Sequence, residues 1–161
     1  MRNYMMTTII FMIATLLLSA CGTKTYEEAF RDAHPNAEIL HEIKIQKGIV
    51  ILYSENQNVG ATELLPEGDG WNVISSNNIG GNGVISHGLI NKEADDEILF
   101  GRINDGNIAK VQLMKEQGEV IEATILEPEK SIWYLKWRYD NAELIGLSKD
   151  GTIFYKSTYR K

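Results

Sequence analysis

The sequence predicts a mainly β protein, in which antiparallel sheets of about ten strands form a meander or a sandwich and one short N-terminal helix comes first. From Ala37 onward, turn signals rich in Gly, Asn and Asp recur at intervals of about nine to thirteen residues. The runs between them are rich in Ile, Val, Leu and aromatic residues, which is typical of strands joined by hairpins. A chain of 161 residues suits a single domain. A closed propeller is excluded, because four blades of about 40 residues each exceed the β-rich segment.

The segment 25–36 predicts the helix. Thr25 and Glu28 have the spacing of a capping box, in which each side chain satisfies a free backbone donor at the helix N-terminus. Apolar residues then recur at helical spacing, namely Tyr26, Ala29, Phe30 and Ala33. Pro35 ends this run because proline cannot continue a helix, so we expect a helix over residues 26–34. An irregular tether is the alternative.

Two runs indicate which strands lie in the core. The run from Ile49 to Tyr53 is apolar throughout, which predicts a central strand covered on both faces. Further along, Trp133, Leu135 and Trp137 occupy alternate positions, so they share one face of a strand, and we expect that face to pack in the core. Trp71 follows a Gly-Asp-Gly turn, and the pattern does not decide its exposure.

Two stretches, 98–114 and 133–155, are loosely alike, since each reads as a strand, an acidic turn and a second strand. We interpret this likeness as that of any two hairpins. Within the first, residues 104–107 are expected to form a tight hairpin turn in which Gly106 adopts a positive φ. The Gly-rich stretch 77–83 is expected to be a connecting loop, with a recognition tip as the alternative. It is not a phosphate cradle, because the run that follows it reads as a strand rather than a helix.

The first 20 residues form a separate segment. Arg2 is followed by an uncharged stretch whose apolar centre, residues 9–18, matches the hydrophobic region of a secretory signal. The stretch ends in Leu18-Ser19-Ala20-Cys21, and Cys21 is the only cysteine of the chain. One alternative is an uncleaved membrane helix, but the 16 residues from Met5 to Ala20 fall short of the usual span and include four hydroxyl side chains. A secreted protein with a chance cysteine at this position is the other.

The stretch from Leu18 to Cys21 resembles the lipobox of bacterial prolipoproteins. The resemblance implies that a diacylglycerol is attached to the Cys21 sulfur and that the chain is cut between Ala20 and Cys21. Two acyl chains on the glyceride are enough for stable anchoring in a bilayer. The resemblance therefore implies three parts, which are a signal peptide (1–20), a lipid-anchored tether (21–24) and a single β-rich extracytoplasmic domain (25–161).

The C-terminal half carries a second resemblance. Its stretches 98–104, 132–134 and 148–153 are similar to those of small uncharacterised lipoproteins of Bacillus-type bacteria. The similarity lies mainly in the succession of hairpins. It implies the same location, on the outer face of the cell membrane, and no activity.

Charge and cysteine content exclude some classes of partner. Arg2 is the only charged residue before Lys24, so the processed chain carries 15 basic and 22 acidic side chains, a net charge of −7. Such a surface repels phosphate backbones, and we expect no nucleic-acid partner. A single cysteine also excludes an intramolecular disulfide and a metal site built on several thiolates.

Residues with catalytic or metal-binding chemistry do not form a known pattern. There is no G-x-S-x-G motif, and Ser86 and His87 are strand neighbours whose side chains point to opposite faces. A zinc site would need His34, His41 and His87 to converge, although they lie on different segments. We expect three exposed strand or loop histidines instead. The sequence therefore favours a protein that is not an enzyme and that holds no cofactor.

The acidic stretch 91–97 is the one candidate for a metal. Glu93, Asp95 and Glu97 stand at every second position and supply the hard oxygens that Ca²⁺ prefers. However, the stretch begins with Asn91 and lacks a glycine for the sharp turn of a calcium loop. We favour a solvated acidic turn over a calcium site, and expect no bound metal.

These observations lead to an expectation of location and to three hypotheses of function. We expect a protein anchored to the extracytoplasmic face of the cell membrane, whose partner is the lipid bilayer, through the acyl chains on Cys21. The favoured hypothesis is a non-catalytic binding or accessory module for a protein or small molecule that the sequence does not identify. One alternative is a carrier of an apolar small ligand, and another is a cell-wall enzyme whose carboxylates converge in a groove.

Overall fold

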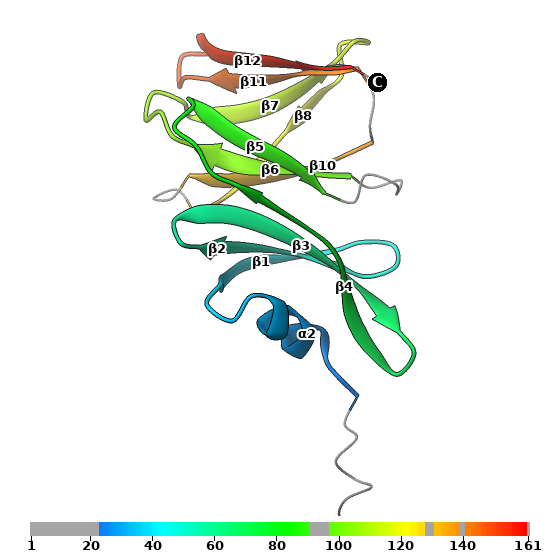
Figure 1. Cartoon of the computed structure of the whole chain (residues 1–161). Helices are drawn as coiled ribbons and strands as arrows, with labels where there is room; N and C mark the ends of the chain where they lie inside the picture. Colours follow the sequence, from blue (N-terminus) through cyan, green and yellow to red (C-terminus); the bar gives the residue numbers. More distant parts are fainter. Residues whose placement is uncertain (1–22, 91–96, 128–130, 139–140, 161) are drawn as a thin grey trace, which may run out of the picture.

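The computed structural model describes residues 23–90, 97–127, 131–138 and 141–160 (Figure 1). These ranges contain the following elements: helix α2 (Tyr26–Ala33) and strands β1 (Glu38–Lys44), β2 (Ile49–Glu55), β3 (Asn58–Glu67), β4 (Gly70–Ile79), β5 (Ile85–Ile90), β6 (Glu97–Ile103), β7 (Lys110–Lys115), β8 (Val120–Glu122), β9 (Thr124–Glu127), β10 (Ile132–Trp137), β11 (Ala142–Leu147) and β12 (Ile153–Tyr159). The prediction of a mainly β fold with one short N-terminal helix is confirmed.

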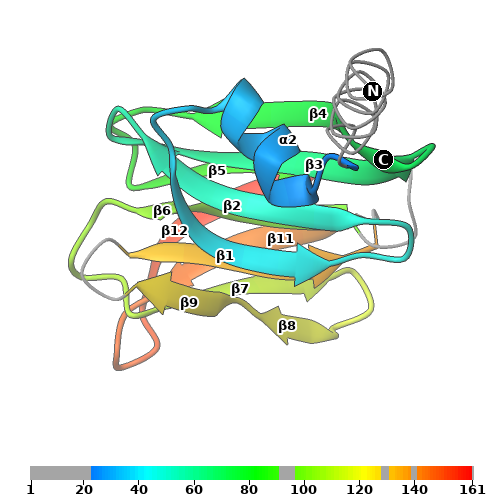
Figure 2. The ribbon, with the colours of Figure 1, turned by 90° about the horizontal axis from the view of Figure 1, so that it is seen from below.

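The strands form three antiparallel sheets of four strands each, stacked face to face (Figure 1). Sheet A is a meander in the order β1-β2-β3-β4, sheet B has the order β5-β6-β10-β9, and sheet C has the order β12-β11-β7-β8. Helix α2 lies across the outer face of sheet A, as Figure 2 shows from below. The molecule therefore has four layers, namely the helix and sheets A, B and C, with sheet B in the interior.

The helix forms where the sequence predicts it and for the predicted reason. The Thr25 hydroxyl accepts the Glu28 backbone N–H at 3.2 Å, and the Glu28 carboxylate accepts the Thr25 N–H at 2.9 Å. This capping box starts the helix at Tyr26. Ala29 and Phe30 are buried and pack on the residues of sheet A that point away from sheet B.

Strand β2 is buried on both faces, as predicted. Ile51 and Tyr53 pack against the helix, whereas Val50 and Leu52 pack against sheet B. Alternate residues of a strand point to opposite faces, so an uninterrupted apolar run suits a strand with a layer on each side. Sheet A is therefore held by apolar contacts to both of its neighbours.

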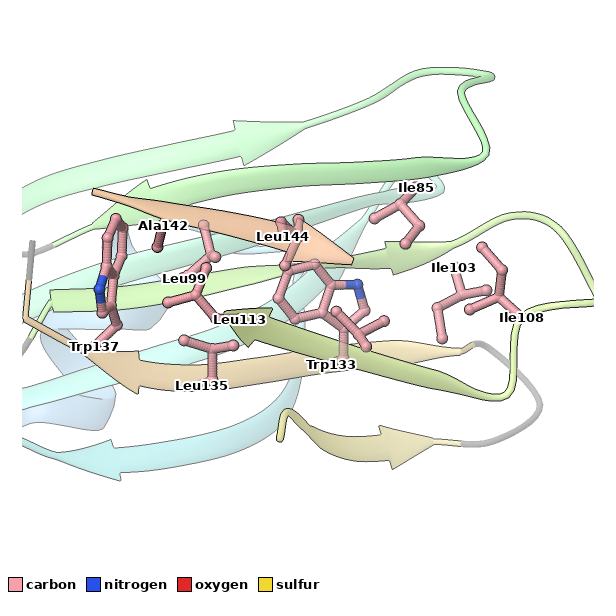
Figure 3. Close-up of a cluster of buried hydrophobic side chains, with 11 residues drawn as sticks. Ile85, Leu99, Ile103, Ile108, Leu113, Trp133, Leu135, Trp137, Ala142 and Leu144 are labelled. Atoms are coloured by element: carbon pink, nitrogen blue, oxygen red, sulfur yellow. The ribbon is translucent and has the colours of Figure 1, made fainter. Parts of the chain in front are cut away.

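The largest core lies between sheets B and C. Trp133, Leu135 and Trp137 project from one face of β10 toward sheet C, and each is at most 3% exposed (Figure 3). The predicted core face of this strand is thus confirmed. Leu113 and Leu144 of sheet C pack against it from the other side.

The chain crosses from sheet B to sheet C twice, in the same way. Strands β5 and β6 lie in sheet B and are followed by β7 and β8 in sheet C; β9 and β10 are likewise followed by β11 and β12. The inner strands of these units pair with each other, β6 with β10 and β7 with β11. The two units therefore have the same topology and pair through equivalent strands. The likeness of 98–114 to 133–155 reflects two sheet-to-sheet crossings rather than two hairpins.

The prediction of a hairpin turn at 104–107 was correspondingly wrong. This segment carries the chain from β6 in sheet B to β7 in sheet C, and Asp105 accepts the Asn107 backbone N–H at 2.9 Å. Nor is Gly106 one of the described glycines with a positive φ. The polar character of this turn was predicted correctly, but the residues of the turn do not determine which sheet the next strand joins.

Close packing of sheet B requires glycine at position 101. A Cβ there would lie 2.2 Å from the Ser86 carbonyl oxygen and 2.7 Å from the Trp133 ring, well inside van der Waals contact. We predict that Gly101→Ala lowers the free energy of unfolding by about 2 kcal/mol or more, because the core must shift to admit the methyl group.

The control is Gly106→Ala, since nothing lies within 4 Å of a Cβ at that position. Urea unfolding followed by circular dichroism gives both values from the midpoints. Equal stability of the two variants would contradict the packing that the structure shows around Trp133.

Candidate functional site

Each of the three histidines connects two adjacent layers. His34, at the end of α2, has Nε2 2.8 Å from the hydroxyl of Thr62 on β3. His41 of β1 has Nε2 3.2 Å from the hydroxyl of Tyr134 on β10, and thereby joins sheet A to sheet B. All three histidines are partly buried. The prediction of exposed histidines was wrong, because the partners of each ring come from strands distant in sequence.

The third histidine belongs to a cluster that joins sheets B and C, which we call the Tyr–His cluster (His87, Tyr155 and Tyr159). Both ring nitrogens of His87 have a partner, with Nε2 2.9 Å from the Tyr155 hydroxyl and Nδ1 2.8 Å from the Tyr159 hydroxyl. A neutral imidazole donates one hydrogen bond and accepts one, which matches two hydroxyl partners. Burial lowers the pKa of His87, which favours the neutral ring.

The neighbouring serine does not take part in this cluster. Ser86 points to the other face of β5, and its hydroxyl donates to the Gly81 carbonyl oxygen at 3.4 Å. The expectation that Ser86 and His87 do not pair is confirmed. With both nitrogens of His87 bonded to tyrosines, the imidazole has a structural role in the folded protein.

A cleft of about 550 Å³ opens at one end of sheet C. It lies between the β7–β8 turn, the start of β11 and the end of β12. Its polar and charged lining includes Lys115, Glu116, Asn141, Glu143, Tyr159 and Arg160. This volume is within the range of small-molecule sites, about 300–1,000 Å³. We call it the sheet C cleft.

The charges of the sheet C cleft are largely compensated within the chain. Lys115 Nζ lies 2.8 Å from a carboxylate oxygen of Glu119, and Lys156 Nζ lies 2.8 Å from one of Glu143. The Asn141 side-chain amide donates to Glu116 at 3.2 Å. The lining therefore offers hydrogen-bonding groups of both kinds beside apolar surface from Met114 and Ala142, with little net charge, which suits a ligand that has both polar and apolar parts.

Tyr159 links the sheet C cleft to the core. Its ring lines the cleft and lies 5.3 Å from the Trp137 ring, centroid to centroid, while its hydroxyl bonds His87. Burial raises the pKa of the Tyr159 phenol well above its usual value, so the hydroxyl stays protonated. One wall of the cleft is therefore joined to sheet B by a hydrogen bond and a ring contact.

The outer edge of sheet C is a second exposed feature. Strand β12 is an edge strand that pairs with β11, and the pairing shifts register between Gly146 and Leu147. Near this shift, Ile153 and Phe154 are 58% and 46% exposed. An open strand edge with apolar side chains can accept an extended peptide segment.

The residues of the expected lipidation and cleavage site, and the calcium candidates that the sequence analysis did not favour, fall mostly outside the described residues. Ala20, Cys21, Glu93 and Asp95 all lie there. Glu97 is described: it is the first residue of β6 and is only 2% exposed, so it does not belong to a solvated acidic turn. The described residues contain no group of three or more His, Cys, Asp or Glu side chains placed to hold a metal ion.

The structure describes both recognition candidates that the sequence left open. Trp71 on β4 is partly buried and contacts Tyr26 edge to face, with the ring centroids 5.6 Å apart, so it helps to hold the helix on sheet A. The stretch 77–83 is not wholly a loop, because β4 continues to Ile79. Within it, the Asn77 side-chain amide donates to the Leu89 carbonyl oxygen at 3.0 Å and so ties β4 to β5.

Fold and site together define a small stack of β-sheets with a cleft of mixed polar and apolar lining and an open strand edge on its outermost sheet. The chain has no significant match to a protein-family model, to a curated protein or to a solved structure. Within the described ranges, no helix has both the length and the apolar character needed to cross a bilayer.

The lowered pKa of His87 predicts a pH dependence of stability. Unfolded chains take up a proton on this imidazole near pH 6.5, whereas the folded protein does so only at lower pH. The stability that this group contributes is therefore present above pH 6.5 and is lost as the pH falls from that value through the lower pKa of the folded protein. We predict that His87→Gln makes the free energy of unfolding depend less steeply on pH between pH 7 and pH 5. The slope should decrease by at most the amount that corresponds to one proton bound by the unfolded chain.

Tyr159→Phe is the matched control. It removes one hydrogen bond of the cluster, at a cost of about 1 kcal/mol, but retains the buried imidazole. The free energy of unfolding of Tyr159→Phe should therefore decrease with falling pH as steeply as that of the wild type. A wild-type slope in His87→Gln would show that this histidine does not resist protonation in the folded state.

Proposed function

We propose that this protein is a lipoprotein anchored to the extracytoplasmic face of the cell membrane by a diacylglycerol on Cys21. The observation that carries the proposal is the position of the only cysteine, at the exit of a short apolar leader and next to Ser19 and Ala20. The start of the folded domain supports it. The capping box begins at Thr25, so only a few residues separate the lipid from the folded domain.

We further propose that the domain is a non-catalytic binding or accessory module. In its support, the hydroxyl of Ser86 and both nitrogens of His87 are engaged in bonds within the fold. Among the described residues, the features on sheet C that other molecules can reach include the sheet C cleft and the edge of β12. These are features suited to recognition, by hydrogen bonds in the cleft and by main-chain pairing at the edge.

The two alternative functions have less support. A carrier of an apolar ligand needs an apolar cavity, whereas the lining of the sheet C cleft includes the charged side chains of Lys115, Glu116 and Glu143. A cell-wall enzyme needs carboxylates that converge in a groove, and Glu116 and Glu143 do line one cleft. However, Glu116 is bonded to Asn141 and Glu143 to Lys156, which ties both carboxylates to structural partners.

Metabolic labelling with radioactive palmitate tests the anchor. We expect the wild-type protein to incorporate label and to sediment with membranes, and Cys21→Ser to lose all of the label, because serine has no sulfur to form the thioether. Gly22→Ala is the control, since it changes the neighbouring residue and leaves the thiol. An unlabelled wild-type protein that stays in the cytosol would refute the proposal.

A screen for hydrolysis tests the absence of catalysis. We expect the purified domain to show no turnover of peptidoglycan, ester or glycoside substrates above the level of a Glu116→Gln, Glu143→Gln double variant. Turnover by the wild type that either single substitution abolishes would assign catalysis to the sheet C cleft and contradict a purely binding role.

A further inference from the structure

The last residue of the tether is held on the folded domain at two points. Lys24 Nζ lies 2.8 Å from a carboxylate oxygen of Asp32 on α2. The Lys24 backbone nitrogen and oxygen lie 3.4–3.5 Å from the position that a Cβ on Gly70 would take, at the start of β4. The tether therefore joins the domain where the helix meets the β3–β4 turn.

The remaining tether is short. Three residue steps separate Lys24 from Cys21, which is a span of at most about 11 Å even when fully extended. Sheets that pack face to face lie about 10 Å apart, so sheet C lies about 20 Å beyond sheet A, and the helix is on the far side of sheet A. A tether of this length keeps Lys24 close to the headgroups.

From this geometry we infer how the domain stands on the membrane, an inference that rests on the proposed lipid anchor. The surface formed by Lys24, the exposed side of helix α2 and the turn 67–70 faces the bilayer, and sheet C is the layer farthest from it. Figure 1 shows the order of the layers on which this inference rests, since the described chain begins at one end of the stack and sheet C forms the other end.

The charge on the bilayer-facing surface determines how closely it approaches the lipid. Its exposed acidic residues outnumber its basic ones, Lys24 and Arg31. The acidic residues are Glu27, Glu28, Asp32, Glu67 and Asp69. Such a surface is repelled by anionic headgroups, and the repulsion falls off within a Debye length. The tether therefore holds the domain at the membrane against this repulsion, and the surface lies closest to headgroups that carry no net charge.

This orientation leaves the exposed features of sheet C accessible to molecules outside the membrane. The sheet C cleft and the apolar pair Ile153 and Phe154 lie on the layer turned away from the lipid, about 30 Å from the helix layer. A partner in the space outside the membrane can reach them without displacing the anchored end. Sheet C is therefore the recognition face of the anchored protein.

Contact quenching from the lipid headgroups tests the orientation. A lipid on Cys21 blocks the native thiol, so a cysteine introduced by Asp69→Cys, Lys149→Cys or Gln117→Cys is the only free one and takes a single fluorophore. All three positions are exposed turn residues, the first next to the tether and the others on sheet C. The full-length chain is processed in cells, labelled and reconstituted into phosphatidylcholine vesicles that carry a nitroxide on the headgroup.

We expect headgroup quenching to be several-fold stronger at position 69 than at positions 149 and 117. Equal quenching at the three positions, or the reverse order, would overturn the inferred orientation. Replacing part of the phosphatidylcholine by phosphatidylglycerol should weaken quenching at position 69 at low salt, and added salt should restore it. Quenching at position 69 that does not respond to anionic lipid would overturn the electrostatic part of the inference.

Failure of the anchor gives a different result. If the wild-type chain does not float with the vesicles and behaves like Cys21→Ser, then the proposed lipidation is wrong, whatever the quenching. If it floats and the order of quenching is reversed, the anchor stands and the orientation is wrong.

Discussion

Burial of sheet B on both faces is the constraint on which the rest of the structure depends. Along β6, Ile98 and Phe100 point into the core shared with sheet A, and Leu99 and Ile103 into the core shared with sheet C. A fully buried aliphatic or aromatic side chain contributes about 1.5–3 kcal/mol, so neither outer sheet can be removed without exposing much of what stabilises sheet B. The requirement for glycine at position 101 follows from the same close packing.

Polar bonds between the layers complement this apolar packing. Apolar contacts are not directional, whereas a hydrogen bond between side chains requires one alignment. His34, His41 and His87 supply such bonds between the helix and sheet A, between sheets A and B, and between sheets B and C. The partners of His41 and His87 are tyrosines. The hydrogen bonds of these two histidines are therefore formed by the hydroxyl groups of side chains whose rings also contact the imidazole.

The two halves of the stack formed by sheets B and C have the same topology but differ in the length of their final strands. The final strand of the first half, β8, is three residues long, whereas its counterpart β12 has seven. The longer strand supplies Tyr155 and Tyr159 to the Tyr–His cluster and extends to the wall of the sheet C cleft. The extra length of β12 lies at the end of sheet C away from the cleft, beyond the point where β8 ends at Glu122, and it gives the outermost sheet a longer open edge that can take part in recognition.

The sequence by itself determined the features that depend on neighbouring residues. The capping box set the start of α2, alternation along β10 identified Trp133 and Trp137 as core, and the strand period separated Ser86 from His87. Only the tertiary structure decided that residues 104–107 cross between sheets, that Glu97 is buried and that the histidines join layers. The sequence did not predict the sheet C cleft. Its walls come from segments that lie about 25 and 40 residues apart in the chain, and these segments meet only through strand pairing. Local patterns specify how a segment folds, whereas the choice of sheet and partner depends on which distant apolar faces fit together, and that information is not present in any single segment.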